Sequence, residues 1–217
     1  MDGLLVDSEP IHAAAYVTAF GEVGLPLHPE QYRQQVTLGG GSIRELYAQA
    51  GGMPEEWPAI FARKQELFAR YLAERGVPLP GAITLLAALA ARGTPCVLAT
   101  GAGRSSAEVV LRHLNLQRFF CLVLAGEDVR RAKPDPEVFH KAARALAVRP
   151  GECVCLEDSP KGVAAAAAAG IPCIAVPTAW TKTGDLSRAA LVAASLEQVT
   201  PQLLEELATA HCAKQGV

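Results

Sequence analysis

Residues 153–170 read CVCLEDSPKGVAAAAAAG, and this stretch decides the fold that we expect. A short apolar run ends in two acids, Glu157 and Asp158. The pair that follows, Ser159-Pro160, is typical of the start of a helix. The alanine run continues that helix up to a glycine. The stretch therefore predicts a buried strand, an acidic loop and a helix in direct succession.

The same succession recurs along the chain from about residue 80 onward. Apolar strands that alternate with helices are typical of a parallel sheet covered by helices on both faces. We therefore expect an α/β core with a doubly wound, Rossmann-like parallel sheet. Its expected strands are 95–100, 121–125, 153–157, 171–176 and 190–194, and its expected helices are 82–92, 105–114, 137–146, 159–169 and 201–210.

Residues 10–79 contain no apolar run with the pattern of a strand. Apolar residues at helical spacing predict helices at 11–23, from about 28 onward, at 42–50 and at 54–75. We interpret this block as an α-helical cap domain, inserted into a core domain formed by residues 1–9 and 80–217. One continuous domain is the alternative, but the helices follow the N-terminal loop too abruptly to favour it.

The composition of the chain argues against several classes of partner. Half of the 217 residues are hydrophobic and the formal net charge is −2, so we expect no nucleic-acid partner. No apolar run is long enough to span a bilayer, so we expect no membrane partner. We expect a monomer or a weak dimer.

The six cysteines lie mostly in short apolar runs. This placement favours buried free thiols and a reducing cytoplasm. A metal-binding thiol pair at Cys153 and Cys155 is the alternative, since alternate residues of a strand share a face. No second pair completes such a site in the sequence.

Polar residues stand where the predicted strands end. Thr100 ends one strand, Lys133 follows another, and Glu157-Asp158 end a third, while Asp2 lies in the opening loop. Because ligands bind at the carboxyl ends of parallel strands, we expect these side chains to form one site. Carboxylates are ligands for Mg²⁺, lysine and threonine can hold phosphate oxygens, and the glycine-rich start of a helix offers N–H donors to an anion.

Four segments together resemble the haloacid dehalogenase superfamily, in the branch with a small helical cap that includes phosphatases and β-phosphoglucomutase. The resemblance covers nearly the whole chain. It is carried by the opening Asp2-Gly-Leu-Leu-Val-Asp-Ser8, by Val97-Leu-Ala-Thr100-Gly, by Lys133-Pro-Asp-Pro-Glu-Val-Phe139 and by Leu156-Glu-Asp-Ser-Pro-Lys-Gly162.

The resemblance implies an acid–base and metal set. Asp2 would act as general acid and base and would ligate Mg²⁺ through its backbone carbonyl. Glu157 and Asp158 would hold the same ion directly or through water. The implied cofactor is therefore Mg²⁺.

The resemblance also implies a phosphate-binding set. Thr100, with the backbone N–H groups of Gly101 and Ala102, would bind the transferring phosphoryl group. Lys133 would bridge the phosphate and the carboxylates. The catalytic residues that we predict are therefore Asp2, Thr100 and Lys133.

The opening segment lacks the leading acid of the family motif and the apolar strand before it. That acid would be the nucleophile that forms an aspartyl phosphate. We therefore expect that Met1 stands where the motif has an internal residue, and that the chain as given lacks turnover. A non-catalytic phosphate-binding relic is the alternative, although removal of a central strand would leave two neighbouring strands unpaired.

The predicted cap offers three candidate substrate contacts, His12, Ser42 and Arg44. His12 corresponds to a cap-side histidine of the mutase that contacts substrate and catalytic acid. The mutase has an arginine directly after the serine, whereas Ile43 stands there in this chain. Lys64 is expected to be solvated.

The predicted function is a Mg²⁺-dependent phosphatase acting on a small phosphorylated metabolite, such as a sugar phosphate or a phosphoglycolate-type compound. A β-phosphoglucomutase-like mutase is the alternative, and the shifted arginine argues against it. Asp2 argues against a dehalogenase, since dehalogenases of this superfamily do not keep that second acid.

Overall fold

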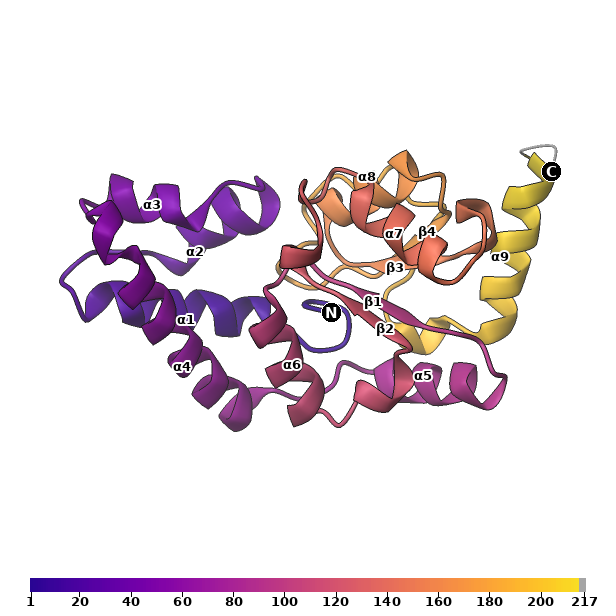
Figure 1. The fold of residues 1–217 in the computed structure, drawn as a ribbon, viewed down its shortest axis with the longest axis horizontal. Coiled ribbons are helices and arrows are strands. Elements are labelled where there is room, and N and C mark those ends of the chain that lie inside the picture. The colour runs from indigo at the N-terminus through magenta and orange to yellow at the C-terminus, as the bar shows by residue number, and fades with distance from the viewer. Residues whose placement is uncertain (215–217) are drawn as a thin grey trace.

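The computed structural model describes residues 1–214, in which a group of helices lies beside an α/β region (Figure 1). The helical region, residues 9–75, contains no strand. Its elements are α1 (Glu9–Gly21), α2 (Pro29–Tyr32), a π-helix (Arg33–Leu38), α3 (Ile43–Gln49), a 3₁₀ turn (Pro54–Glu56) and α4 (Trp57–Arg75).

The helical region has a closed apolar core between α1 and α4. The buried residues of α4 recur at intervals of three or four, which places them on one face of the helix. Phe68 and Leu72 from this face, with Phe20 from α1, are at most 1% exposed. Packing of this face against α1 therefore organises the region.

The α/β region contains five short strands and five helices between residues 82 and 214. The strands are β1 (Val97–Ala99), β2 (Leu122–Leu124), β3 (Cys155–Glu157), β4 (Cys173–Ala175) and β5 (Leu191–Val192). The helices are α5 (Ala82–Ala91), α6 (Arg104–His113), α7 (Glu137–Ala145), α8 (Pro160–Ala168) and α9 (Pro201–Lys214). Each predicted strand and helix of this region is present, with the strands shorter than expected.

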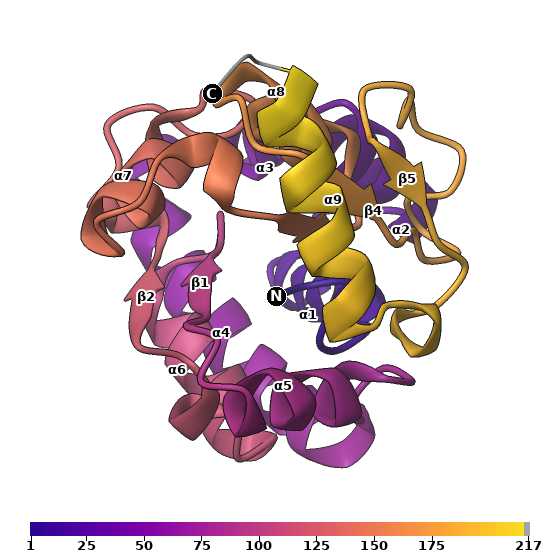
Figure 2. The same cartoon turned by 90° about the vertical axis from the view of Figure 1, so that its right-hand side faces the viewer.

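The strands form two parallel sheets where the sequence predicted one. β1 pairs with β2, and β3 pairs with β4, which pairs with β5. Within residues 1–214, no strand joins β1 to β3. Figure 2 shows the amino terminus between the sheet of β1 and β2 and the sheet that contains β4.

The two chain segments that connect the helical region to the α/β region lie side by side. In the N-terminal loop, Val6 forms an antiparallel bridge with Pro78, and Leu79 donates its N–H to the carbonyl of Leu5. The chain therefore enters and leaves the helical region at one joint. Along residues 1–214, no helix is both long enough and apolar enough to cross a bilayer.

Candidate active site

Lys133 connects the two sheets at their carboxyl ends. Its Nζ donates to the carbonyl of Ala99 in β1 at 3.0 Å and forms a short ion pair with Glu157 in β3. Burial works to lower the pKa of Lys133, but the carboxylate of Glu157 outweighs burial and raises it. In turn, burial works to raise the pKa of Glu157, and the charge of Lys133 holds it below its usual range. Both groups are therefore charged at neutral pH.

Asp158 lies next to this pair and is also buried. Burial, and then the negative charge of Glu157, raise the pKa of Asp158 to about 8. Its carboxylate packs against Gly3, where a Cβ atom would lie 2.1 Å from Oδ2. Gly3 has a positive φ of 66°, so glycine at this position serves both the turn and the close approach of the acid.

These acids are of the right kind for a divalent cation. Hard oxygen ligands suit Mg²⁺, and an uncompensated buried carboxylate such as Asp158 is stabilised by a nearby cation. However, no three His, Cys, Asp or Glu side chains of residues 1–214 converge on one point that could hold an ion. The carboxylates present are therefore of the chemical kind that Mg²⁺ prefers, but too few of them converge to complete an ion site.

Two side chains at the start of α1, those of Ser8 and His12, hold Asp2 in place. Ser8 donates its hydroxyl to Asp2 Oδ1 at 2.5 Å, and His12 Nε2 lies 3.3 Å from the same oxygen. Burial works to raise the pKa of Asp2, but the hydrogen bonds from His12 and Ser8 hold it below its usual range. Asp2 is therefore an ionised carboxylate at neutral pH.

Lys64 lies behind His12, and the expectation that it is solvated was wrong. Its Nζ lies 2.8 Å from His12 Nδ1, and the side chain is only 3% exposed. The same ammonium lies 4.9 Å from the ring centre of Tyr16 and 4.7 Å from that of Phe68. Burial lowers the pKa of Lys64 to about 8, despite the opposing charges of Asp2 and Glu9.

Asp2, His12 and Lys64 thus form a chain of contacts from the site into the helical region. If Lys64 donates to Nδ1, then Nε2 carries the hydrogen and donates to Asp2, which fixes the histidine tautomer. His12 is also stacked on Phe68, with ring centres 4.0 Å apart. The sequence contained a signal for Lys64, because it lies three or four residues from the apolar positions Ile60, Leu67 and Phe68.

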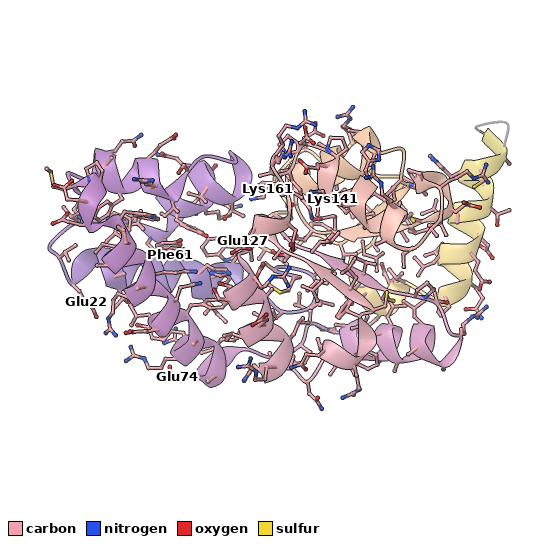
Figure 3. All side chains as sticks on the ribbon, viewed as in Figure 1. Glu22, Phe61, Glu74, Glu127, Lys141 and Lys161 are labelled. Atoms are coloured by element: carbon pink, nitrogen blue, oxygen red, sulfur yellow. The ribbon has the colours of Figure 1, made fainter. Side chains whose placement is uncertain are left out.

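The predicted phosphate-binding loop follows β1, but its backbone donors are largely engaged. The N–H of Ala102 donates to Thr100 Oγ1 at 3.1 Å. The N–H of Arg104, at the start of α6, donates to the carboxylate of Glu127. Figure 3 shows Glu127 beside this end of α6. Gly101 stands in open space, with nothing within 4 Å of a Cβ built there, so an anion has room at this residue.

Ser42 and Arg44 lie on the surface of α3. Ser42 Oγ accepts the backbone N–H of Arg44 at 3.2 Å and so caps the helix. Among the described residues, no hydrogen bond joins either side chain to Asp2, Thr100, Lys133 or the acids of β3. The structure therefore groups the core residues with His12 and leaves these two apart.

Two polar side chains, whose contacts the sequence did not indicate, join the helical region to the α/β region. Arg33 donates to the carbonyl of Trp180 at 3.0 Å and to Thr183 Oγ1 at 2.9 Å. Gln65 Nε2 lies 3.0 Å from the hydroxyls of both Ser105 and Ser106. These contacts hold the helical region over the end of the sheets.

A family model described as haloacid dehalogenase-like hydrolase matches residues 1–170. The chain belongs to this family. The match confirms the predicted resemblance to this family. Together with relatives that are named as phosphatases, it also confirms the predicted enzyme class, a phosphoric monoester hydrolase.

The relatives of the chain include CbbY and phosphatases. CbbY encoded on a plasmid of Cupriavidus necator is 31% identical over 88% of this chain and 82% of its own length. Fructose-1-phosphate phosphatase YqaB of Escherichia coli is 31% identical over 81% of this chain and 93% of its own length. A crystal structure of CbbY from Rhodobacter sphaeroides with phosphate has a TM-score of 0.86 and 27% identity, over 94% of this chain and 96% of that one. The α/β fold class is therefore confirmed.

Proposed function

We propose that this protein is a Mg²⁺-dependent phosphatase that hydrolyses a small phosphorylated metabolite of the sugar phosphate kind. The observation that carries the proposal is the position of Lys133, which reaches from β1 to Glu157 between Thr100 and Asp158. Phosphoryl transfer depends mainly on positioning and on neutralisation of charge. A buried lysine beside acids that suit Mg²⁺ supplies both.

The relatives support the choice of substrate class. YqaB is named as a fructose-1-phosphate phosphatase, and a relative from Drosophila melanogaster is named as a probable pseudouridine-5′-phosphatase. Rhodobacter sphaeroides CbbY has also been crystallised with xylulose-(1,5)bisphosphate. A small phosphorylated sugar or nucleoside is common to these names, and we extend it to this chain.

Each side chain of the site has a distinct task in the proposed reaction. Mg²⁺, held by Asp158, Glu157 and the backbone carbonyl of Asp2, would neutralise phosphate charge. Thr100 and Lys133 orient the phosphoryl group. Asp2 would accept the proton of the water that attacks the phosphoryl group, because its carboxylate is held in place by Ser8 and His12. His12 and Lys64 hold Asp2 in place and in its charged form.

The mutase alternative is less well supported by the helical region. A mutase must hold a second phosphate there, and Arg44 is an exposed residue at the start of α3. Conversion of glucose 1-phosphate to glucose 6-phosphate would restore that alternative.

A reducing cytoplasm as the location of the protein remains a prediction. Its support is that all six cysteines are free thiols.

The test measures inorganic phosphate released from fructose 1-phosphate, xylulose 1,5-bisphosphate, pseudouridine 5′-phosphate and phosphoglycolate, with Mg²⁺ and with a chelator. The protein tested carries an apolar strand and an aspartate before Met1. We expect release from at least one substrate, dependent on Mg²⁺ and lost in Asp158→Asn. Glu205→Gln is the control, because Glu205 lies on the surface of α9 and its partner is Arg92 rather than a residue of the site. No release from any substrate would reject the proposal.

A further inference from the structure

Two tyrosine hydroxyls of the helical region have no hydrogen-bond partner. The chain has four tyrosines, and the hydroxyls of Tyr47 and Tyr71 each bond to another side chain. Tyr16 in α1 and Tyr32 in α2 are only 6% exposed. Within residues 1–214, neither of their hydroxyls makes a hydrogen bond. Buried hydroxyls normally have a partner, so these two are available to bind a further group.

Both hydroxyls also remain in contact with solvent. Among the described residues, Asp7 Oδ1 is the one side-chain oxygen or nitrogen that is fully enclosed and has no partner. The hydroxyls of Tyr16 and Tyr32 therefore keep some access to solvent, although the residues as a whole are buried. A ligand can bind such a hydroxyl without first breaking a hydrogen bond inside the protein.

The two rings are held in place by other rings and by a cation. The ring centres of Tyr16 and Tyr32 lie 5.8 Å apart. Tyr16 is stacked with Trp57 at 6.4 Å, and the ammonium of Lys64 lies 4.9 Å from its ring centre. Tyr32 meets Trp180 edge to face at 6.5 Å. Because Trp180 belongs to the α/β region, Tyr32 lies where the two regions meet, and these ring contacts fix the direction of its hydroxyl.

Tyr32 lies close to the carboxylates of the site. Burial, then the charge of Glu9 and, with smaller effects, Tyr16 and Asp2, raise the pKa of Tyr32 well above its usual value. Burial also raises the pKa of Tyr16. Both phenols are therefore neutral at physiological pH, and each can donate one hydrogen bond and accept others.

This position beside Asp2 relates the tyrosines to one part of the substrate. In the proposed reaction Asp2 acts as general acid and base at the oxygens on the phosphorus. The organic group joined to one of these oxygens would therefore lie near Asp2 and Tyr32. The phosphoryl group itself would be bound by Thr100 and Lys133.

The surroundings of the two phenols favour a neutral organic group over a second anion. The carboxylates of Asp2 and Glu9 would repel a further negative charge. The ammonium of Lys64 is already engaged, because its Nζ lies 2.8 Å from His12 Nδ1. Sugar hydroxyls carry no charge and both donate and accept hydrogen bonds, which matches what the phenols offer.

We propose that Tyr16 and Tyr32 form a hydroxyl-binding site for the organic part of the substrate, which is therefore a neutral, polyhydroxylated group of the sugar kind. The hydroxyl contacts depend on these two phenols. That the bound compound is a phosphate ester rests on the proposed function.

The first test compares Tyr16→Phe and Tyr32→Phe with the unchanged protein in the phosphate-release assay described above. Tyr71→Phe is the matched control, since the hydroxyl of Tyr71 bonds to Thr18. The substrates are fructose 1-phosphate, pseudouridine 5′-phosphate and para-nitrophenyl phosphate, of which the last has no hydroxyl on its organic group.

Loss of one neutral hydrogen bond to the substrate should lower kcat/KM for a sugar-type phosphate about 10-fold, mainly through KM. Release from para-nitrophenyl phosphate should stay within about twofold, and Tyr71→Phe should resemble the unchanged protein with every substrate. Equal kcat/KM for the sugar-type phosphates in both variants and the unchanged protein would overturn the proposal and leave the proposed function standing.

Thermal unfolding provides a measurement that does not depend on turnover. Phenylalanine at position 16 or 32 removes a hydroxyl without a partner, so the midpoint should equal or exceed that of the unchanged chain. Tyr71→Phe loses a hydrogen bond and should lower the midpoint by about 2–4 °C. An equal fall in all three variants would show that the hydroxyls bond within the protein, and would overturn the proposal.

Tryptophan fluorescence measures binding directly, because Trp57 and Trp180 adjoin the two tyrosines. Fructose 1-phosphate or pseudouridine 5′-phosphate should change the fluorescence saturably, with a dissociation constant about 10-fold higher in Tyr32→Phe and unchanged in Tyr71→Phe. Equal affinity in Tyr32→Phe and the unchanged chain, or no saturable change with either compound, would overturn the proposal. Tyrosine-dependent binding without phosphate release from any substrate would establish the hydroxyl-binding site and reject the proposed function.

Discussion

The helical region packs its apolar side chains into a closed core, whereas a cavity divides the strands of the α/β region. In the helical region, Phe20, Tyr47 and Leu72 are fully buried against one another's helices. In the α/β region, the strands divide into two sheets around a cavity of about 440 Å³. A helix satisfies its backbone within itself, whereas a strand depends on its neighbours. A sheet therefore depends on contacts between separate segments more than a helical bundle does.

The two regions therefore differ in how closely their apolar side chains pack, and the following variants test this difference.

The largest effect is expected for Lys133→Met. This change removes the ion pair that joins the sheets and leaves Glu157 as a buried, uncompensated carboxylate. Breaking one side of such a pair costs about 3–5 kcal/mol. Urea unfolding measures the loss, and the double variant Lys133→Met/Glu157→Gln should recover part of it. Equal stability of the single and double variants would contradict a direct charge pair.

Two leucines test the comparison of the cores directly. Leu72→Ala in the helical region should cost about 2–5 kcal/mol, as for a well-packed core leucine. Leu89→Ala, at the wall of the cavity, should cost at least about 1 kcal/mol less, since part of its side chain already faces open space. The measurement is the free energy of unfolding in urea. A larger loss for Leu89→Ala would show that the cavity walls pack closely.

The pH dependence of the free energy of unfolding should reveal the lowered pKa of Lys64. Its pKa is lowered to about 8 in the folded protein, compared with 10.5 when unfolded. Between these values the unfolded state binds more protons, so the stability contributed by this group rises with pH, by up to about 3 kcal/mol. Below pH 8 both states are protonated and the contribution is constant.

The comparison is between the wild-type chain and Lys64→Met, because other groups also titrate in this range. The free energy of unfolding at pH 7.5 and at pH 10 should increase less in the variant. An identical increase in both proteins would show that Lys64 keeps its ordinary pKa.

The smallest effect is expected from two glycines with a positive φ. Gly3→Ala introduces both an unfavourable φ and a collision with Asp158, whereas Gly24→Ala introduces only the unfavourable φ, since nothing lies within 4 Å of its Cβ. Each should lose about 1–2 kcal/mol from the backbone. Only Gly3→Ala should also weaken Mg²⁺ binding, measured by calorimetry. Equal Mg²⁺ affinity of the two variants would exclude Asp158 as a ligand.

Much of the fold could be predicted because its signals are local. The Ser159 cap, the alanine helix α8 and the strand β3 follow the pattern of residues 153–170 directly. The grouping of Lys133 with Glu157 followed from the rule that the carboxyl ends of parallel strands meet. The family match supports the same motifs over residues 1–170.

The remaining features depend on contacts between distant segments. The burial of Lys64 is set by His12 and Phe68, which come from different helices. The carboxylate of Glu127 accepts the N–H of Arg104 at the start of α6, so this contact joins residues that follow two different strands. The contacts of Arg33 with Trp180 and Thr183 join residues 147 and 150 positions apart in the chain. Sequence periodicity places Lys64 on the buried face of α4, but it carries no information about the partners in any of these pairs.

The bridge between Val6 and Pro78 means that the chain enters and leaves the helical region at one place. Elsewhere the two regions meet through the packing of α4 on α6, through the rings of Tyr32 and Trp180, and through the hydrogen bonds of Arg33 and Gln65. Each of these hydrogen bonds contributes only about 1 kcal/mol. We therefore expect Arg33→Ala to loosen this interface and to change substrate capture, while the acids and Lys133 stay as they are.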